Sequence, residues 1–211
     1  MRLYSNEEIL KHIKHYENEL NEAYSLLGFL KNYDGEISED VELVANQLTE
    51  NIKIVCFISA CFLDVATSLK GLTNIESNWE RKFYLKNGFV AIYESMITFN
   101  KHQKVIYQLI KNDFPDLLDE YTKITSKIKE VKKEHNYESL ISNFRNKAGA
   151  HYDEDFETYF EHLKSIDKPE SVKTVLDFSH ILMSLIIFWS DLIDVFQNET
   201  LNKMEIITRN N

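Results

Sequence analysis

The stretch IVCFISACFL, residues 54–63, decides the fold class. It is apolar on almost every side of the helix that its neighbours predict, so it fits the centre of a helical bundle better than a surface. A second run of this kind, ILMSLIIFW, spans residues 181–189. Both runs are shorter than the roughly 20 apolar residues that cross a bilayer, so we expect no transmembrane segment. The two runs predict two central helices around which the rest of the chain packs.

The composition favours long helices. The 211 residues include only two prolines and five glycines, and 44% of them are hydrophobic. So few turn-forming residues argue against a β fold, while the apolar content is sufficient for a packed core. A chain of this length is most simply one domain. We therefore predict a single all-α, up-and-down helical bundle over residues 1–211.

Caps and breaks locate the helices along the chain. Ser5 and Glu8 form a capping box at the start of the first helix, and the proline of DFPD, residues 113–116, predicts a break because the residue before a proline disfavours helical geometry. The expected helices cover about residues 5–31, 38–70, 75–112, 116–135, 138–148, 154–165 and 170–197. The bundle proper would then span about 39–197, followed by a short C-terminal tail over 198–211.

The two cysteines indicate a reducing compartment. Cys56 and Cys61 lie five residues apart in an apolar helical run, which separates them by about 7.5 Å along the helix. That spacing does not allow a disulfide, so we expect both thiols to be reduced. The N-terminal residues are polar and lack the apolar region of a signal peptide. The sequence therefore predicts a cytoplasmic protein.

Charge is unevenly distributed along the chain. The net charge is −10, and residues 1–50 and 153–211 carry −7 each. Residues 79–112 contain six basic and two acidic side chains, and residues 122–147 contain seven basic and three acidic ones. The positive charge is therefore concentrated in the middle of the chain. Lys129, Lys132 and Lys133 either form a solvated helix face or contact an acidic ligand.

FRNKAGAHYDED, residues 144–155, carries the residues best suited to chemistry. Cleavage of RNA without a metal needs an acid, a base and a fixed cation near the phosphate. Histidine titrates near neutral pH and suits the first two tasks, whereas arginine offers a planar, permanently charged fork that fits phosphate oxygens. Arg145 and His151 are the candidates, and Asn146 can orient either of them. We expect Ala148-Gly149-Ala150 to end the helix so that Arg145 and His151 point into one cleft.

The arrangement Arg145-Asn146, four intervening residues and His151 resembles the signature motif of the HEPN superfamily. The resemblance covers roughly residues 40–197 and implies a helical bundle whose members are often metal-independent endoribonucleases of toxin–antitoxin, abortive-infection and other defence systems. It implies a homodimer in which two motifs face one cleft. The chain is therefore expected to cleave single-stranded or loop RNA through attack of the ribose 2′-OH, in a defence or toxin-type system. A bound antitoxin or other defence protein is a possible partner.

Roles follow for the residues around the motif. His151 would be the general acid or base, Arg145 would hold the phosphate, and Asn146 would orient them. Lys147 and the lysines of the preceding helix would bind the RNA backbone, and Tyr152 would stack on a base. The expected RNA-binding residues are Lys147, Tyr152, Lys129, Lys132 and Lys133. We expect no cofactor, no metal and no membrane contact.

One other interpretation of the motif remains open. Arg145 could form a salt bridge at a helix end with His151 as a capping residue, which would make the chain a non-catalytic helical module that binds a partner protein. Neutralisation of Arg145 or His151 by acids such as Asp153 and Asp155 would favour that interpretation.

Elsewhere in the chain, one helix face carries two histidines and two glutamates, which are Glu8, His12, His15 and Glu19. This pattern is better explained as a solvated face than as a metal site. His180 is expected to be a hydrogen-bonded core residue, and Trp79 and Trp189 are expected to pack in the core.

Overall fold

The structure, a computed structural model, describes residues 5–31, 39–149 and 156–209. Every regular element in these ranges is helical, which confirms the all-α prediction. The elements are α1 (Asn6–Lys31), α2 (Glu39–Leu72), α3 (Asn78–Asp113), the 3₁₀ turn η1 (Pro115–Leu117), α4 (Leu118–Glu134), the π-helical turns η2 (Glu138–Ser142) and η3 (Arg145–Gly149), α5 (Phe156–Ile166) and α6 (Pro169–Arg209).

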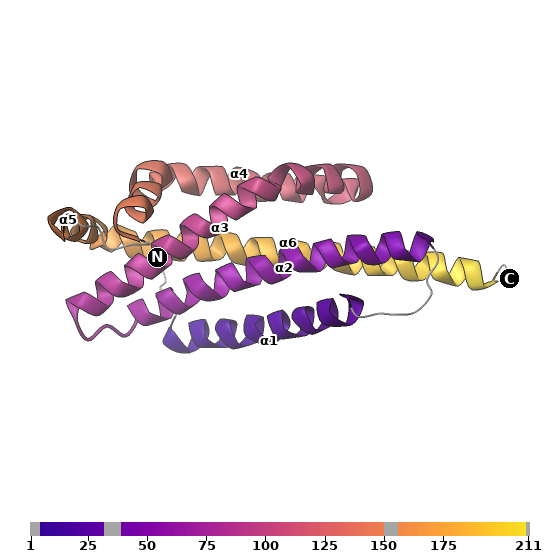
Figure 1. Cartoon of the computed structure of the whole chain (residues 1–211), viewed down its shortest axis with the longest axis horizontal. Helices are drawn as coiled ribbons and strands as arrows, with labels where there is room; N and C mark the ends of the chain where they lie inside the picture. The colour runs from indigo at the N-terminus through magenta and orange to yellow at the C-terminus, as the bar shows by residue number, and fades with distance from the viewer. Residues whose placement is uncertain (1–4, 32–38, 150–155, 210–211) are drawn as a thin grey trace.

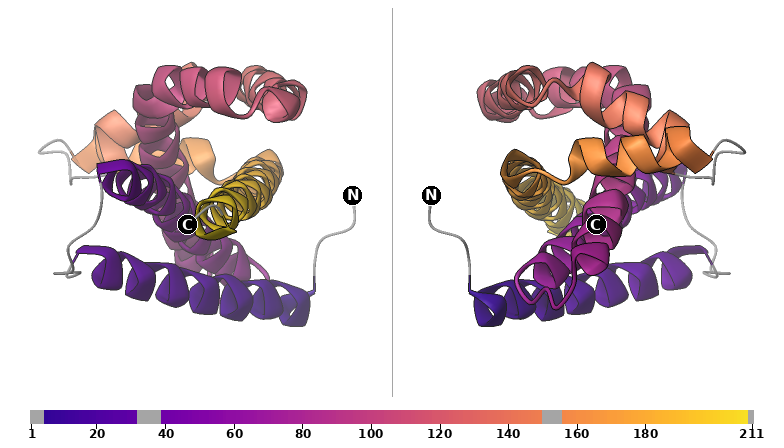
Figure 2. Two further views of the ribbon diagram at one scale, coloured as in Figure 1. Left: turned by 90° about the vertical axis from the view of Figure 1, so that its right-hand side faces the viewer. Right: turned by 90° about the vertical axis from the view of Figure 1, so that its left-hand side faces the viewer.

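The two apolar runs form the centre of the bundle, as the sequence predicted. Helices α2 and α6 lie side by side along the long axis, with α1 against α2 on one side and α4 against α6 on the other (Figures 1 and 2). Helix α3 packs on α2 and then diverges from it towards α4, while α5 lies at one end of the bundle (Figure 1). The motif region, η2 and η3, contacts α3 near this end.

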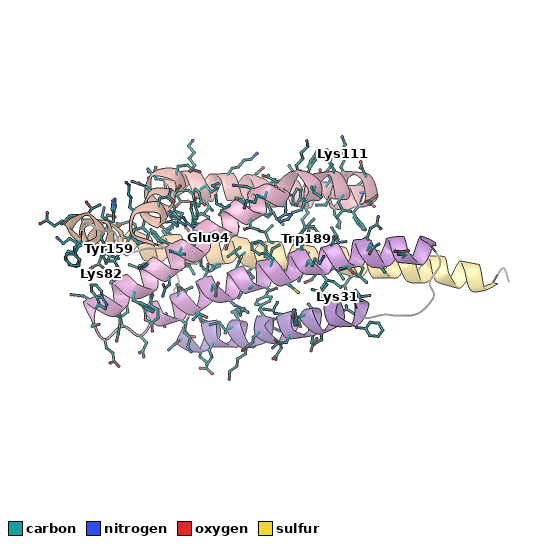
Figure 3. All side chains as sticks on the ribbon, in the orientation of Figure 1. Lys31, Lys82, Glu94, Lys111, Tyr159 and Trp189 are labelled. Atoms are coloured by element: carbon teal, nitrogen blue, oxygen red, sulfur yellow. The ribbon has the colours of Figure 1, made fainter. Side chains whose placement is uncertain are left out.

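The core is formed by large side chains from α2, α3 and α6. Val65, Phe89 and Trp189 are fully buried, and Figure 3 shows Trp189 in the interior of the bundle. Trp189 thus packs in the core as predicted. The same prediction was wrong for Trp79, whose exposed fraction is 56%, because it lies in the first turn of α3 beyond the crossing with the central helices.

Two helices are long and apolar enough to cross a membrane by length and composition: α2 over Ala45–Leu72 and α6 over Pro169–Val195. In this fold they pack against each other. Half of the residues in each apolar window are buried inside the bundle. The buried residues of both helices belong to the core of the bundle.

Most helix boundaries lie where the caps and breaks placed them. The Glu8 backbone N–H donates to Ser5 Oγ (3.2 Å) and the Ser5 backbone N–H donates to the Glu8 carboxylate (2.7 Å), so the capping box is present. Helix α3 ends at Asp113, before Pro115, and α6 begins at Pro169. The predicted end of the last helix near residue 197 was wrong, since α6 continues to Arg209. Residues 198–209 contain neither proline nor glycine, so nothing in them stops a helix.

Two glycines allow close helix packing. Gly88 of α3 is buried at the crossing with the central helices, where an added Cβ would lie 3.1 Å from a Val175 methyl group and 3.4 Å from Ser68 Cβ. An added Cβ at Gly71, near the end of α2, would overlap the ring of Tyr84. The absence of side chains at these two points lets α3 approach both α2 and α6.

Candidate functional site

The motif region begins at a sharp break after α4. The chain leaves α4 after Glu134, and Asn136 adopts the left-handed conformation with φ of 48°. This confirms the break predicted between the helices expected at about 116–135 and 138–148. The chain then returns to helical geometry through η2 and η3, where hydrogen bonds skip one residue more than in an α-helix. Such π-helical turns are rare and are found frequently at functional sites.

Arg145 stands at the start of η3 and is held by α3. Its Nε and Nη2 donate to the same carboxylate oxygen, Oε1 of Glu94, at 2.9 and 2.8 Å. The guanidinium carbon lies 5.1 Å from the ring centroid of Tyr93. The Arg145 side chain is 32% exposed and that of Glu94 51%, and Figure 3 shows Glu94 part-way along α3, between Lys82 and the central Trp189. One edge of the guanidinium is therefore fixed at the surface, and no hydrogen bond or ion pair within the described ranges involves Nη1.

A pair of tyrosine rings connects Arg145 to the end of α4. The rings of Tyr93 and Tyr137 are nearly parallel, at 7°, with centroids 6.5 Å apart. Lys132 Nζ lies 4.2 Å from the Tyr137 centroid, as Arg145 lies over Tyr93. Two cations thus border one pair of rings, an arrangement stabilised by the negative ring faces. Burial raises the pKa of the Tyr137 phenol, with the nearby Glu138 adding to the effect, so the ring stays neutral at physiological pH.

The other predicted residues divide into two groups. Asn146, Lys147 and Lys133 are exposed, as contact with RNA requires. His151 and Tyr152 belong to residues 150–155, outside the described part of the chain, so the prediction that Arg145 and His151 share a cleft stays a prediction. Turn η3 extends through Gly149, so the helical turn includes the residue that was expected to end it. The acid that pairs with Arg145 is Glu94, whereas Asp153 and Asp155 lie in the same undescribed segment.

Lys129 lies in a groove between α3 and α4, which we call the basic groove. Its volume is about 450 Å³. Hydroxyl and amide side chains line it together with two lysines, and no carboxylate does. The lining residues are Asn100, Gln103, Lys104, Tyr107, Tyr121, Thr122, Thr125 and Lys129. This composition suits an anion, because every charged group that borders the groove is a cation.

Three side chains with metal-ligating atoms converge where α4 meets α6. Ligand atoms of Glu134, His135 and Asp177 lie within 4.8 Å of one another. Lys173 Nζ, however, lies 2.6 Å from both Glu134 Oε1 and Asp177 Oδ2, so a protein ammonium already bridges the two carboxylates. His135 Nε2 lies 2.8 Å from Asp177 Oδ2, and Nδ1 lies 3.0 Å from Thr174 Oγ1. We call these side chains the α4–α6 network.

The pKa shifts in this network agree with tight ion pairing. Burial alone would raise the pKa of Asp177, but hydrogen bonds from Lys173 and His135 outweigh it and lower that pKa. The hydrogen bond from Lys173 likewise lowers the pKa of Glu134. Hydrogen bonds to Asp177 and Glu134 raise the pKa of Lys173. The network therefore joins the two helices through charges that stay ionised at neutral pH.

The histidine–glutamate stripe of α1 is not simply a solvated face. Glu8 belongs to the helix cap, and His12 is half-buried beside His180 and Met183 of α6. His15 and Glu19 are exposed at the edge of a second groove. His180, expected to be a hydrogen-bonded core residue, is half-buried, and burial lowers its pKa. Within the described ranges, the stripe does not gather its ligand atoms in one place.

Sequence reasoning missed both Glu94 and the tyrosine pair. Glu94 lies 51 residues before Arg145, and such a distance leaves no local pattern. One signal was present, since Glu94 is one of only two acids among residues 79–112. An isolated carboxylate in a basic segment is a good candidate for a partner of a functional arginine. No family model, no curated protein and no solved structure matches the chain, so the function must be argued from this geometry.

Proposed function

We propose that the surface around Arg145 is the active site of a metal-independent endoribonuclease that cleaves single-stranded or loop RNA. The observation that carries the proposal is the fixed guanidinium of Arg145. Glu94 binds its Nε–Nη2 edge and Tyr93 lies against its face, while Nη1 has no partner in the described ranges. A cation held in place before substrate binds can stabilise a phosphorane-like transition state without first reorganising.

The proposed reaction needs only side chains of this motif. The ribose 2′-oxygen attacks the neighbouring phosphorus as a base takes its proton, and the bond to the 5′-oxygen breaks as an acid protonates that oxygen. The products are a cyclic phosphate and a free 5′-hydroxyl. His151 would act as base or acid, Arg145 would bind the non-bridging oxygens, and Asn146, exposed one residue after Arg145, would orient the reacting groups.

A homodimer is part of the proposal. One His151 cannot be base and acid in the same step, whereas two motifs related by a two-fold axis supply both groups. The proposed RNA path runs from Arg145 past Lys132, which borders the same tyrosine pair, and along α4 to Lys129 in the basic groove. The exposed Lys133 and Lys147 would contact phosphates at the edges of this path.

A biological role follows from the resemblance to the HEPN superfamily rather than from geometry. On that ground we propose a defence or toxin-type function in the cytoplasm, restrained by an antitoxin or another protein of the same system. Expression of an active enzyme would then arrest growth.

One observation favours a second candidate function, a non-catalytic helical module that binds a partner protein. Glu94 neutralises the charge of Arg145, which weakens the attraction of the guanidinium for a phosphate. In that case the Arg145–Glu94 pair would join η3 to α3 and have no other role. Removal of Glu94 distinguishes the two functions. If the Arg145–Glu94 pair is purely structural, its loss should lower stability and have no other effect.

The test is an RNA cleavage assay in EDTA with the wild-type chain and four variants. The proposal expects cleavage of an RNA strand and none of an all-deoxy strand of the same sequence. His151→Ala and Arg145→Ala should each lower the rate by about 10²–10⁴. Arg145→Lys should be nearly as damaging as Arg145→Ala, because lysine lacks the planar fork. Glu94→Gln should lower the rate by about tenfold through loss of positioning.

Helix content and melting temperature supply the controls. His151→Ala should keep both close to wild type, so its loss of activity could not be attributed to unfolding. Lys14→Gln, which removes an exposed lysine from α1, should leave the rate unchanged. Activity that requires Mg²⁺, or that persists in His151→Ala, would exclude the proposed mechanism and favour the interaction module.

A further inference from the structure

A second groove of similar size lies on the opposite side of the bundle. It runs between α1 and α6, with α2 as its floor, and has a volume of about 430 Å³. In the end view of Figure 2, α1 lies across one side of the α2–α6 pair. Side chains from all three helices line the groove. We call it the acidic groove. Its volume lies in the range typical of small-molecule sites.

Carboxylates border the acidic groove on both sides. Glu19 and Glu22 come from α1, and Asp191 and Asp194 come from α6. Each pair is three residues apart, so its two side chains share a helix face. No lysine or arginine lines the groove, and no ion pair within the described ranges neutralises these four acids. His15 is the one basic side chain among the described residues that line the groove. The groove therefore presents two separated negative charges on each wall.

The floor of the groove is aliphatic with one buried hydroxyl. Ile52 and Val55 of α2 and Ile186 of α6 form the apolar surface. Ser59 follows Val55 by one helical turn on the same face of α2, so its side chain points towards the groove. The residue is only 1% exposed, and its hydroxyl has no hydrogen-bond partner in the described part of the chain.

Two other buried serines, one in α2 and one in α3, show that Ser59 is unusual. Ser68 Oγ donates to the Asp64 carbonyl at 3.1 Å, and Ser95 Oγ donates to the Ala91 carbonyl at 2.6 Å. Ser59 has the same option with the carbonyl four residues before it and does not use it. A buried hydroxyl without a partner is destabilising, and a bound ligand with a hydrogen-bonding group would satisfy it.

We infer that the acidic groove binds a linear aliphatic polyamine, with its ammonium groups against the two carboxylate pairs and its methylene chain over the apolar floor. The carboxylates do not converge as metal ligands do, since the one group of metal-ligating side chains that converges within the described ranges is in the α4–α6 network. A compact divalent ion would therefore find few oxygens at once. A cation with separated charges matches both walls, and one amine can donate to Ser59 Oγ.

The experiment is isothermal titration of the full chain with spermidine at 150 mM salt. We expect one saturable site per chain and at least tenfold weaker binding of propylamine, which has a single charge and a short chain. Asp191→Asn/Asp194→Asn should weaken spermidine binding by about tenfold or more. Ser59→Ala should also weaken it while raising the melting temperature of the unliganded protein, because the unsatisfied hydroxyl is removed.

The matched control is Glu7→Gln/Glu17→Gln, which removes the same charge from exposed positions of α1 outside the groove. Its spermidine affinity should equal that of the wild type. Equal weakening in both double variants, displacement of spermidine by an equal concentration of Mg²⁺, or absence of saturable binding would overturn the inference. The inference would also be overturned if spermidine failed to bind while a lysine-rich helical peptide bound in a way that depends on Asp191 and Asp194. The occupant of the groove would then be a protein helix. None of these outcomes depends on RNA cleavage.

Discussion

The basic groove and the acidic groove have nearly the same volume, about 450 and 430 Å³, but opposite charge. The first is bordered by Lys104 and Lys129 and by no carboxylate, whereas the second is bordered by four carboxylates and by no lysine or arginine. Both are walled by helices of one bundle, and the pair α2–α6 lies between them (Figure 2). Their difference therefore comes from the side chains on their walls.

The comparison explains how a chain with a net charge of −10 can offer a site for an anion. Helices α1 and α6 come from the acidic segments 1–50 and 153–211, and α3 and α4 come largely from the basic segments 79–112 and 122–147. Folding places the acidic α1 beside the acidic part of α6 at one groove and the basic segments of α3 and α4 beside each other at the other groove. The local field at a groove, rather than the net charge, then decides which ligand it attracts.

The largest effect is expected from a substitution in the core that disrupts both grooves at once. Trp189 is fully buried in α6 between the two sides, and Trp189→Ala should lower the free energy of unfolding by about 3–5 kcal/mol because it leaves a large cavity. Urea denaturation measures this. Polyamine and RNA binding should weaken together, since both depend on the central helices. Loss of one activity with retention of the other would show that the grooves fold independently.

Trp189→Phe is the control for this prediction. Trp189 Nε1 is buried and has no hydrogen-bond partner in the described ranges. Phenylalanine keeps most of the ring and removes the unsatisfied N–H, so we expect a loss of less than about 1.5 kcal/mol. A loss equal to that of Trp189→Ala would mean that the indole N–H has a partner.

The second prediction tests the basic groove alone. Lys104→Gln/Lys129→Gln should weaken RNA binding by about tenfold at low salt. It should also reduce the slope of log affinity against log salt by about 1.4, because each phosphate contact with a single strand contributes about 0.7. Filter binding over a salt series measures both. Lys11→Gln/Lys14→Gln removes two exposed lysines from α1 and should change neither. Equal effects of the two pairs would contradict a local site.

The third prediction concerns acid. Asp177 joins α4 of the basic groove to α6 of the acidic groove, and its pKa is lowered in the fold by Lys173 and His135. Its stabilisation is therefore present above the unfolded pKa of about 3.9 and is lost as the pH falls through the lower folded pKa. Asp177→Asn should cost about 1 kcal/mol at pH 7 and flatten the acid limb of a stability–pH curve measured by urea denaturation. An unchanged acid limb would exclude this role.

The smallest effect is expected from the loss of ion pairs that lie away from both grooves, which should stay intact. Arg81 Nε lies 2.9 Å from Asp167 Oδ1, and Lys82 Nζ lies 2.8 Å from Oδ2. Hydrogen bonding from Lys82 lowers the pKa of Asp167. The two ion pairs connect α3 to the segment between α5 and α6. Asp167→Asn should cost about 0.5 kcal/mol, as expected for a partly exposed ion pair. Spermidine and RNA affinities should not change, and a change in either would show that this end of the bundle controls a groove.

The fold could be predicted from the sequence to a large extent because its signals are local. The apolar run 54–63, the capping box at Ser5 and the prolines each act within a few residues, and the structure has helices where they predicted them. The end of α6 was missed because a helix without a stop signal has no local end. Trp79 was misjudged because burial depends on where neighbouring helices pass, which residue type alone does not show.

The candidate site could be predicted only in part. Arg145 was found through its motif, and its surface position agrees with the proposed role. Glu94 and Tyr93 could not be found, because the contact between α3 and η3 joins residues about 50 positions apart. The acidic groove was missed for a related reason. Its charges come from the two ends of the chain, and only the packing of α1 and α6 against α2 makes them neighbours.

The π-helical turns η2 and η3 also affect how this region tolerates a change in length. Each such turn holds one residue more than an α-helical turn would between the same hydrogen-bonded groups. Deletion of one residue between Ser142 and Arg145 could be absorbed by a return to α-helical geometry, with little disturbance of the backbone. The side chains that follow would then keep their orientation, and Arg145 would still face Glu94. A deletion within a regular α-helix of the bundle would instead rotate the following side chains by about 100°.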